Sequence, residues 1–136
     1  MSTARSQIAA AETAQHTPRR IDEFLRDVLV KGGSDLHFVA GDPPRIRLHG
    51  ELQTLRDALL GQEQVREALT EIMSRRALER LEEMDGADFA YTIPGVSRFR
   101  VNVFRHIGGL GGVFRAIPSK ALTLDPSIAV SAPARE

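Results

Sequence analysis

The most restrictive feature of this 136-residue sequence is a stretch near its end in which apolar and polar residues alternate. Between positions 98 and 103 the apolar residues are Phe99, Val101 and Val103, and they alternate with arginine or asparagine. A period of two predicts a strand with one buried and one open face. Because the glycine-rich segment 107–112 and a second extended segment, 112–117, follow, we predict a β-hairpin.

The rest of the chain adds helices and short strands. Apolar side chains at i, i+3, i+4, i+7 and i+8 predict an amphipathic first helix that Gly32 and Gly33 end; the stripe is Ile21, Phe24, Leu25, Val28 and Leu29. Two more helices are expected over 62–74 and 75–84. Further extended segments are expected over 35–40, 44–49, 52–55 and 88–93. Strands joined by hairpins predict an α+β fold, with a mainly antiparallel sheet and helices on one face.

The two ends of the chain do not follow this pattern. Up to Pro18 the sequence is small and polar, with Ile8 the only large apolar residue after Met1, which predicts a disordered lead over 1–18. The end of the chain, DPSIAVSAPARE, is typical of a linker. We therefore expect one domain over 19–118 and a tail over 119–136.

Composition excludes several classes of protein. The 18 basic and 18 acidic residues cancel, which argues against a domain that coats nucleic acid. The absence of cysteine excludes disulfides, a thiol nucleophile and a cysteine-based zinc site. No apolar stretch approaches the ~20 residues of a membrane-spanning helix, and no signal core is present. A cytoplasmic location is the expectation.

A nucleotide-binding P-loop is also missing from the sequence. That loop needs a lysine directly after a glycine, and neither Lys31 nor Lys120 is preceded by a glycine. The run GGLGG at 108–112 lies between two predicted strands, so we interpret it as a hairpin turn rather than a phosphate loop.

Metal and nucleophile sites receive little support. His37 and His49 lie on predicted strands near Asp35 and could ligate a metal, but a partly buried, hydrogen-bonded histidine is the favoured interpretation. Ser34, Asp35 and His37 are adjacent in sequence, unlike a catalytic triad, and Ser34 is expected to cap a turn. We predict no catalytic residue and no metal ligand.

The arginines of the predicted hairpin are more informative. If the turn centres on Gly108 and Gly109, residue 100 pairs with 117 and residue 102 with 115. Arg100 and Arg115 are then diagonal neighbours on one face, roughly 6–8 Å apart. Such a pair could clamp an anion, or could be solvated or bridged to helix carboxylates, and spacing alone favours the second alternative.

Two stretches, SDLHFVAGDPPRIRLHGEL (34–52) and DFAYTIPGVSRFRVNVFRHIGGLGGVFRAIPSKALTL (88–124), resemble the N-terminal domain of the type IV pilus retraction ATPases, the PilT family of twitching motility. The resemblance extends over about Ile21 to Leu124. It implies a PAS-like domain that precedes a RecA-like motor domain in a hexamer. It further implies that Arg100 and Arg115, with Arg98 as a weaker third residue, contact the ATP phosphates of a composite site.

The same resemblance defines what the chain lacks. The motor's P-loop, acidic metal-binding motifs and histidine motif have no counterpart here, so we expect no activity from this chain alone, and ATP with Mg²⁺ only together with a motor domain. The implied partners are that motor domain and the pilus machinery at the inner membrane, with no nucleic acid and no membrane span. The alternative is a stand-alone PAS-like sensor or adaptor that binds a small ligand or a protein.

Overall fold

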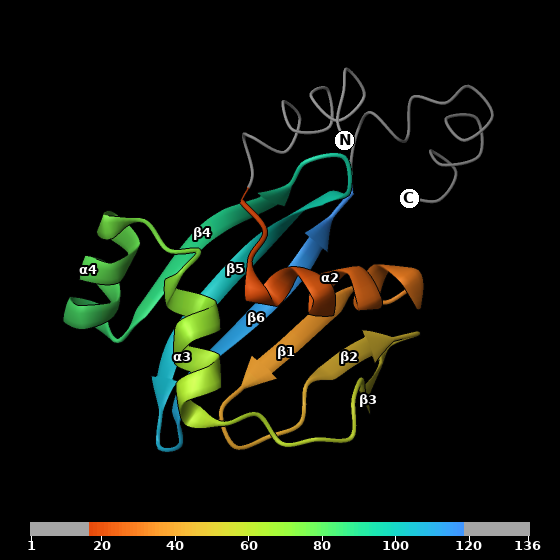
Figure 1. The fold of residues 1–136 in the computed structure, drawn as a ribbon, viewed down its shortest axis with the longest axis horizontal. Helices are drawn as coiled ribbons and strands as arrows, with labels where there is room; N and C mark the ends of the chain where they lie inside the picture. The colour runs from red at the N-terminus through yellow and green to blue at the C-terminus, as the bar shows by residue number, and fades with distance from the viewer. Residues whose placement is uncertain (1–16, 119–136) are drawn as a thin grey trace, which may run out of the picture.

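The computed structural model describes residues 17–118 (Figure 1). The elements in chain order are α2 (Arg20–Val30), β1 (Asp35–Val39), β2 (Arg45–Leu48), β3 (Glu51–Thr54), α3 (Gln62–Thr70), α4 (Arg75–Met84), β4 (Gly86–Ile93), β5 (Ser97–His106) and β6 (Gly109–Ile117). This order is the predicted one. The predicted tail and all but the last two residues of the predicted lead lie outside the described residues.

The six strands form one sheet in the order β3-β2-β1-β6-β5-β4, and every neighbouring pair is antiparallel. The first and the last strand, β1 and β6, therefore lie side by side in the middle of the sheet. Helices α2 and α3 lie across one face, and α4 packs beside the edge strand β4 (Figure 1). The predicted α+β class and antiparallel sheet are confirmed.

The core lies between the sheet and the helices. Four of the five residues of the predicted stripe on α2 are fully buried or nearly so, and Leu29 is partly buried against them. They pack against the strand residues Leu36, Phe38, Ile46, Phe99, Val101, Val103 and Phe114. Ala77 and Leu81 of α4 join the same cluster. Because each large apolar side chain contributes ~1.5–3 kcal/mol when buried, this cluster supplies most of the stability.

The turn between β5 and β6 is shorter than the sequence indicated. β5 runs to His106 and pairs there with Gly109, the first residue of β6. Only Ile107 and Gly108 form the turn. The interpretation of GGLGG as a hairpin turn is therefore wrong for most of the run, which continues as strand.

The glycines inside β6 are required by close packing instead. A Cβ on Gly112 would lie 2.9 Å from Leu69 of α3, on the covered side of the sheet. A Cβ on Gly111 would lie 2.6 Å from the ring of Phe104. Real Cβ atoms do not approach so closely, so Gly112 lets α3 come down onto the sheet and Gly111 lets Phe104 lie against β6.

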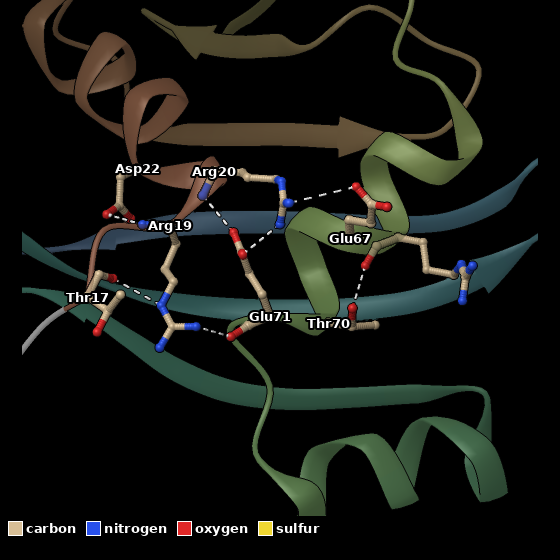
Figure 2. Close-up of polar contacts among 8 residues, drawn as sticks. Thr17, Arg19, Arg20, Asp22, Glu67, Thr70 and Glu71 are labelled. Atoms are coloured by element: carbon tan, nitrogen blue, oxygen red, sulfur yellow. Dashed lines mark hydrogen bonds and ion pairs between the residues drawn. The ribbon is translucent and has the colours of Figure 1, made fainter.

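Polar contacts join the start of α2 to the end of α3 (Figure 2). The Arg20 backbone N–H donates to Glu71 Oε2 at 2.6 Å, and the Arg20 side chain donates to Oε1 of the same carboxylate at 2.8 Å. The Arg19 guanidinium donates to the Glu71 backbone oxygen. The Arg19 backbone N–H donates to Asp22 at 3.0 Å, which satisfies a donor at the helix start.

Asp22 also joins α2 to the sheet. The hydroxyl of Tyr91 on β4 donates to Asp22, and both residues are buried, at 3% and 9% exposure. Burial and the hydrogen bond to the carboxylate raise the pKa of Tyr91 well above its ordinary value. The hydroxyl therefore keeps its proton and remains a donor to Asp22 throughout the physiological range.

Candidate functional site

The sheet face turned away from the helices, which we call the open face, carries the predicted site residues. Alternate residues of five strands form it: Asp88 of β4, Arg98, Arg100, Asn102 and Phe104 of β5, Val113 and Arg115 of β6, Asp35 and His37 of β1, and Arg45 and Arg47 of β2. Arginines outnumber carboxylates on this face, although the chain as a whole has no net charge. The open face is therefore basic.

Arg100 and Arg115 lie directly opposite each other on β5 and β6. The predicted register, with the two arginines diagonal, is wrong by two residues, because the turn centres between Ile107 and Gly108. A shift of two residues leaves every side chain on its predicted face, since the side-chain period of a strand is two. Like charges in directly opposed positions repel, and cross-strand neighbours are only ~5 Å apart at Cα.

The two arginines differ in their partners. Arg115, whose side chain is 70% exposed, has its Nε 3.6 Å from Oδ2 of Asp35. Arg100 is exposed and makes no hydrogen bond or ion pair with another residue between 17 and 118. The bridge to a helix carboxylate that the sequence left open is thus not formed in this part of the chain, because the carboxylate at Arg115 comes from strand β1.

The sequence placed Asp35 only beside a possible metal site or triad, and its pairing with Arg115 was missed. Asp35 is the direct cross-strand partner of Arg115, and the two residues come from opposite ends of the domain. No local pattern encodes a pairing between the first and the last strand. The only hint was the position of an aspartate at the start of a strand.

Arg100 and Arg115 line one depression on the open face. Its volume is about 240 Å³, and its other lining residues are Asp88, Val101, Asn102 and Val113. The Asn102 amide donates to Asp88 Oδ1 at 2.9 Å, so the second carboxylate of the site is engaged by an amide and not by an arginine. Two guanidinium groups in one depression can bind an anion with several N–H donors at once.

Arg98, the weaker third candidate, lies on the same face two residues before Arg100 and opposite Ile117. It stands outside the lining of the depression. A rise of ~3.4 Å per residue places it about 7 Å further along the strand. A ligand that reaches Arg98 therefore has to extend beyond the depression.

The two histidines of the considered metal site are separated. His37 lies on the open face, whereas His49 is not on a strand as predicted but in the turn after β2, with φ of 54°. Within residues 17–118 no three potential ligands come together. His37 is partly buried as expected, but its Nε2 is enclosed and lacks a hydrogen-bond partner in the described chain.

The charged groups around His37 are three arginines and one aspartate. Burial lowers the pKa of His37, and the nearby guanidinium of Arg47 lowers it further, while Asp35 acts in the opposite direction. The Ser34 hydroxyl donates to Asp35 at 2.6 Å and not to His37. The order of contacts that a catalytic triad requires is therefore not formed by these three residues.

A small-ligand sensor would need a pocket between the sheet and the helices, in the space where the apolar core lies. The buried apolar cluster occupies the region between sheet and helices. A second depression, of about 200 Å³, lies instead where the β5–β6 turn meets α3, and its basic and imidazole groups are Arg66, Arg105 and His106. No helix within residues 17–118 is long and apolar enough to cross a membrane.

Comparison with known proteins relates the chain to pilus ATPases, although no family model matches it. The type IV pilus retraction ATPase PilT of Pseudomonas aeruginosa is 42% identical over 105 residues, which cover 77% of this chain and 30% of PilT. The type IV pilus ATPase PilU of the same organism is 33% identical over 104 residues, and a twitching motility protein of Neisseria gonorrhoeae is 34% identical over 102. The chain thus spans less than a third of the length of these relatives.

Solved structures agree with these sequence matches. The pilus retraction motor PilT with bound ADP superimposes with a TM-score of 0.68 and 31% identity, over 76% of this chain and 30% of that one. The ATPase DotB of Legionella pneumophila shares the fold, with a TM-score of 0.63 at 21% identity. The described domain is therefore a homologue of the N-terminal domain of PilT-family pilus ATPases.

Proposed function

We propose that this domain supplies Arg100 and Arg115 to the phosphates of ATP bound on a RecA-like motor domain, in a hexameric type IV pilus retraction ATPase. Arg98 adds a third contact where the ligand extends beyond the depression. The domain is not catalytic alone, and its place is the cytoplasm, at the inner-membrane side of the pilus machinery. Its role is electrostatic: it stabilises phosphate charge and senses whether the γ-phosphate is present.

The direct opposition of Arg100 and Arg115 carries this proposal. A domain selected for stability alone would separate two like charges or place a carboxylate at each of them. Here one arginine of the pair has a carboxylate partner and the other has none between residues 17 and 118. A phosphate group would neutralise both guanidinium groups at once. Two adjacent, rigid strands can keep the guanidinium groups in position for such a ligand.

The chemistry that the domain lacks has to come from its partner. The described residues hold no group of metal ligands, and the sequence has no P-loop lysine. ATP and Mg²⁺ therefore arrive on the motor domain, which supplies the phosphate loop and the metal-binding carboxylates. The arginines of this domain close the site from the opposite side.

The proposal is tested by mixing the chain with an isolated PilT motor domain and measuring ATP turnover and binding between the two. We expect the wild-type chain to raise ATP turnover. In the double variant Arg100→Ala/Arg115→Ala this increase should be smaller by on the order of a hundredfold. Arg76→Ala, which removes an exposed arginine of α4, serves as the matched control and should behave as wild type. Equal turnover with the double variant would refute the proposal.

The alternative, a stand-alone sensor or adaptor, is distinguished by a thermal-shift screen of the chain against nucleotides and common metabolites. A ligand that binds the native state raises the melting temperature, and the rise grows with the logarithm of the ligand concentration relative to its Kd. A metabolite that stabilises the chain without any motor domain, and equally in the double arginine variant, would favour the alternative.

A further inference from the structure

Asp35 occupies a central position among the arginines of the open face. It lies between two of them: Arg115 on β6 and Arg47 on β2 are its direct cross-strand partners. The Arg47 guanidinium donates to the Gly50 backbone oxygen at 3.1 Å. Arg115 is the arginine whose guanidinium pairs with Asp35.

The Asp35 carboxylate is held in place. Its side chain is only 8% exposed, and Ser34 donates a hydrogen bond to Oδ1 at 2.6 Å. The other oxygen, Oδ2, is the one near Arg115. A carboxylate that is buried, hydrogen-bonded on one oxygen and paired on the other cannot turn away to solvent without losing both contacts.

This arrangement determines which edge of Arg115 is used. The guanidinium of arginine has N–H donors on two edges, and the contact to Asp35 is made from Nε. The terminal nitrogens of Arg115 remain available on a side chain that is 70% exposed. Arg115 and Arg100 line the same depression.

We propose that Asp35 is the positioning residue of the arginine pair. Its carboxylate anchors Arg115 by the Nε edge and so presents the terminal nitrogens, together with the guanidinium of Arg100, to a phosphate. This inference rests on the proposed function of the pair. It adds that a negative charge next to the site increases the affinity for a polyanion.

The direction in which Asp35→Asn changes the affinity for a polyanion distinguishes positioning from a simple electrostatic effect. If Asp35 acted only through its charge, its replacement by the neutral, isosteric asparagine would strengthen polyanion binding, because one repulsive charge is removed. If Asp35 acts by positioning, the same replacement weakens binding, because Arg115 has to be ordered each time an anion binds.

The test is made on the full chain by NMR of the arginine Nε–H groups, with inorganic tripolyphosphate as the probe. In the wild type we expect slow exchange of the Arg115 Nε–H with water, and shifts of the Arg100 and Arg115 signals along one binding curve. Asp35→Asn should speed the Arg115 exchange and weaken tripolyphosphate binding, each roughly fivefold, the scale of a partly exposed ion pair. Ser34→Ala should act in the same direction with a smaller change, and Asp35→Glu should restore part of the loss.

Asp88→Asn is the matched control, because it removes the other carboxylate of the depression, which contacts Asn102 and not an arginine. It should leave the Arg115 exchange unchanged and bind tripolyphosphate as well as wild type or better.

Unchanged Arg115 exchange, or tighter binding, in Asp35→Asn would overturn the positioning role. Should that variant not fold, Ser34→Ala decides the question by the same two readouts. If wild type shows no response of Arg100 and Arg115 to the probe while Asp35→Asn still speeds the Arg115 exchange, the anion-binding part of this inference fails and the hold of Asp35 on Arg115 stands. The turnover test with the motor domain then decides the proposed function separately.

Discussion

The two sides of the sheet differ in how their charged side chains are paired. On the covered side, the buried carboxylate of Asp22 accepts from the Arg19 backbone N–H and from the Tyr91 hydroxyl. Glu71, at the end of α3, accepts from both Arg19 and Arg20 (Figure 2). On the open face, Arg100 and Arg115 stand opposite each other, and one buried carboxylate serves Arg115.

This difference separates the residues that stabilise the domain from those that await a partner. Polar groups that are buried against the helices have to be satisfied within the chain, because nothing else can reach them. The side chains of Arg100 and Arg115 on the open face are accessible, so their unfavourable arrangement costs little and can be relieved by a bound anion. The predictions below test this division, from the largest expected effect to the smallest.

The largest effect should come from neighbouring residues of β6 that point to opposite faces. Phe114→Ala empties a fully buried ring position and should lower the free energy of unfolding by about 3–5 kcal/mol. Val113→Ala, on the open face, should cost less than about 1.5 kcal/mol because its site is already partly exposed. Urea unfolding of both variants measures the two values, and similar losses would show that the open face is packed like the core.

The next effect concerns the buried hydrogen bond between helix and sheet. Tyr91→Phe removes one donor from the Asp22 carboxylate, which is 3% exposed and cannot gain water in exchange. We expect a loss of about 1–3 kcal/mol in the free energy of unfolding, measured by urea at neutral pH. An unchanged midpoint would mean that the remaining donors to Asp22 are sufficient.

A smaller effect is the acid sensitivity contributed by His37 on the open face. The fold holds its pKa below the ordinary value of 6.5, through burial and the charges of Arg47, Arg45 and Arg115, with Asp35 opposing them. The unfolded chain thus binds this proton more readily, so the contribution to stability is complete above pH ~6.5 and is lost as pH falls through the folded pKa. His37→Asn should show a shallower decline of stability between pH ~7.5 and ~5.5, and an unchanged decline would contradict the assignment.

The smallest effect is expected at the arginine pair itself. Arg100→Ala removes one of two opposed like charges, so stability should change by no more than about 0.5 kcal/mol, in the stabilising direction. The gain should shrink as salt is added, because screening weakens the repulsion in the wild type. A clear loss of stability in thermal unfolding would mean that Arg100 has a structural ion-pair partner.

Local patterns predicted most of this fold. The apolar stripe of α2 and the bounds of α4 follow from spacing within a few turns of chain, and the faces of β5 follow from the alternation between Arg98 and Val103. The glycine run hid the centre of the turn, because glycines needed for close packing look the same in sequence as glycines needed for a turn. Asp35 and Arg115 are neighbours only because β1 pairs with β6. Packing of the whole core determines that pairing, so no local pattern predicts it.

The place of β6 between β1 and β5 has a consequence for how the chain is made. A ribosome that has synthesised everything up to β5 has produced the helices and five strands, yet the sheet is still in two halves without their shared central strand. Contacts between the ends of a chain are slow to form, so closure of the sheet is the step that we expect to limit folding. Because Arg115 is carried on that last strand, the domain cannot expose a complete arginine pair before it has folded.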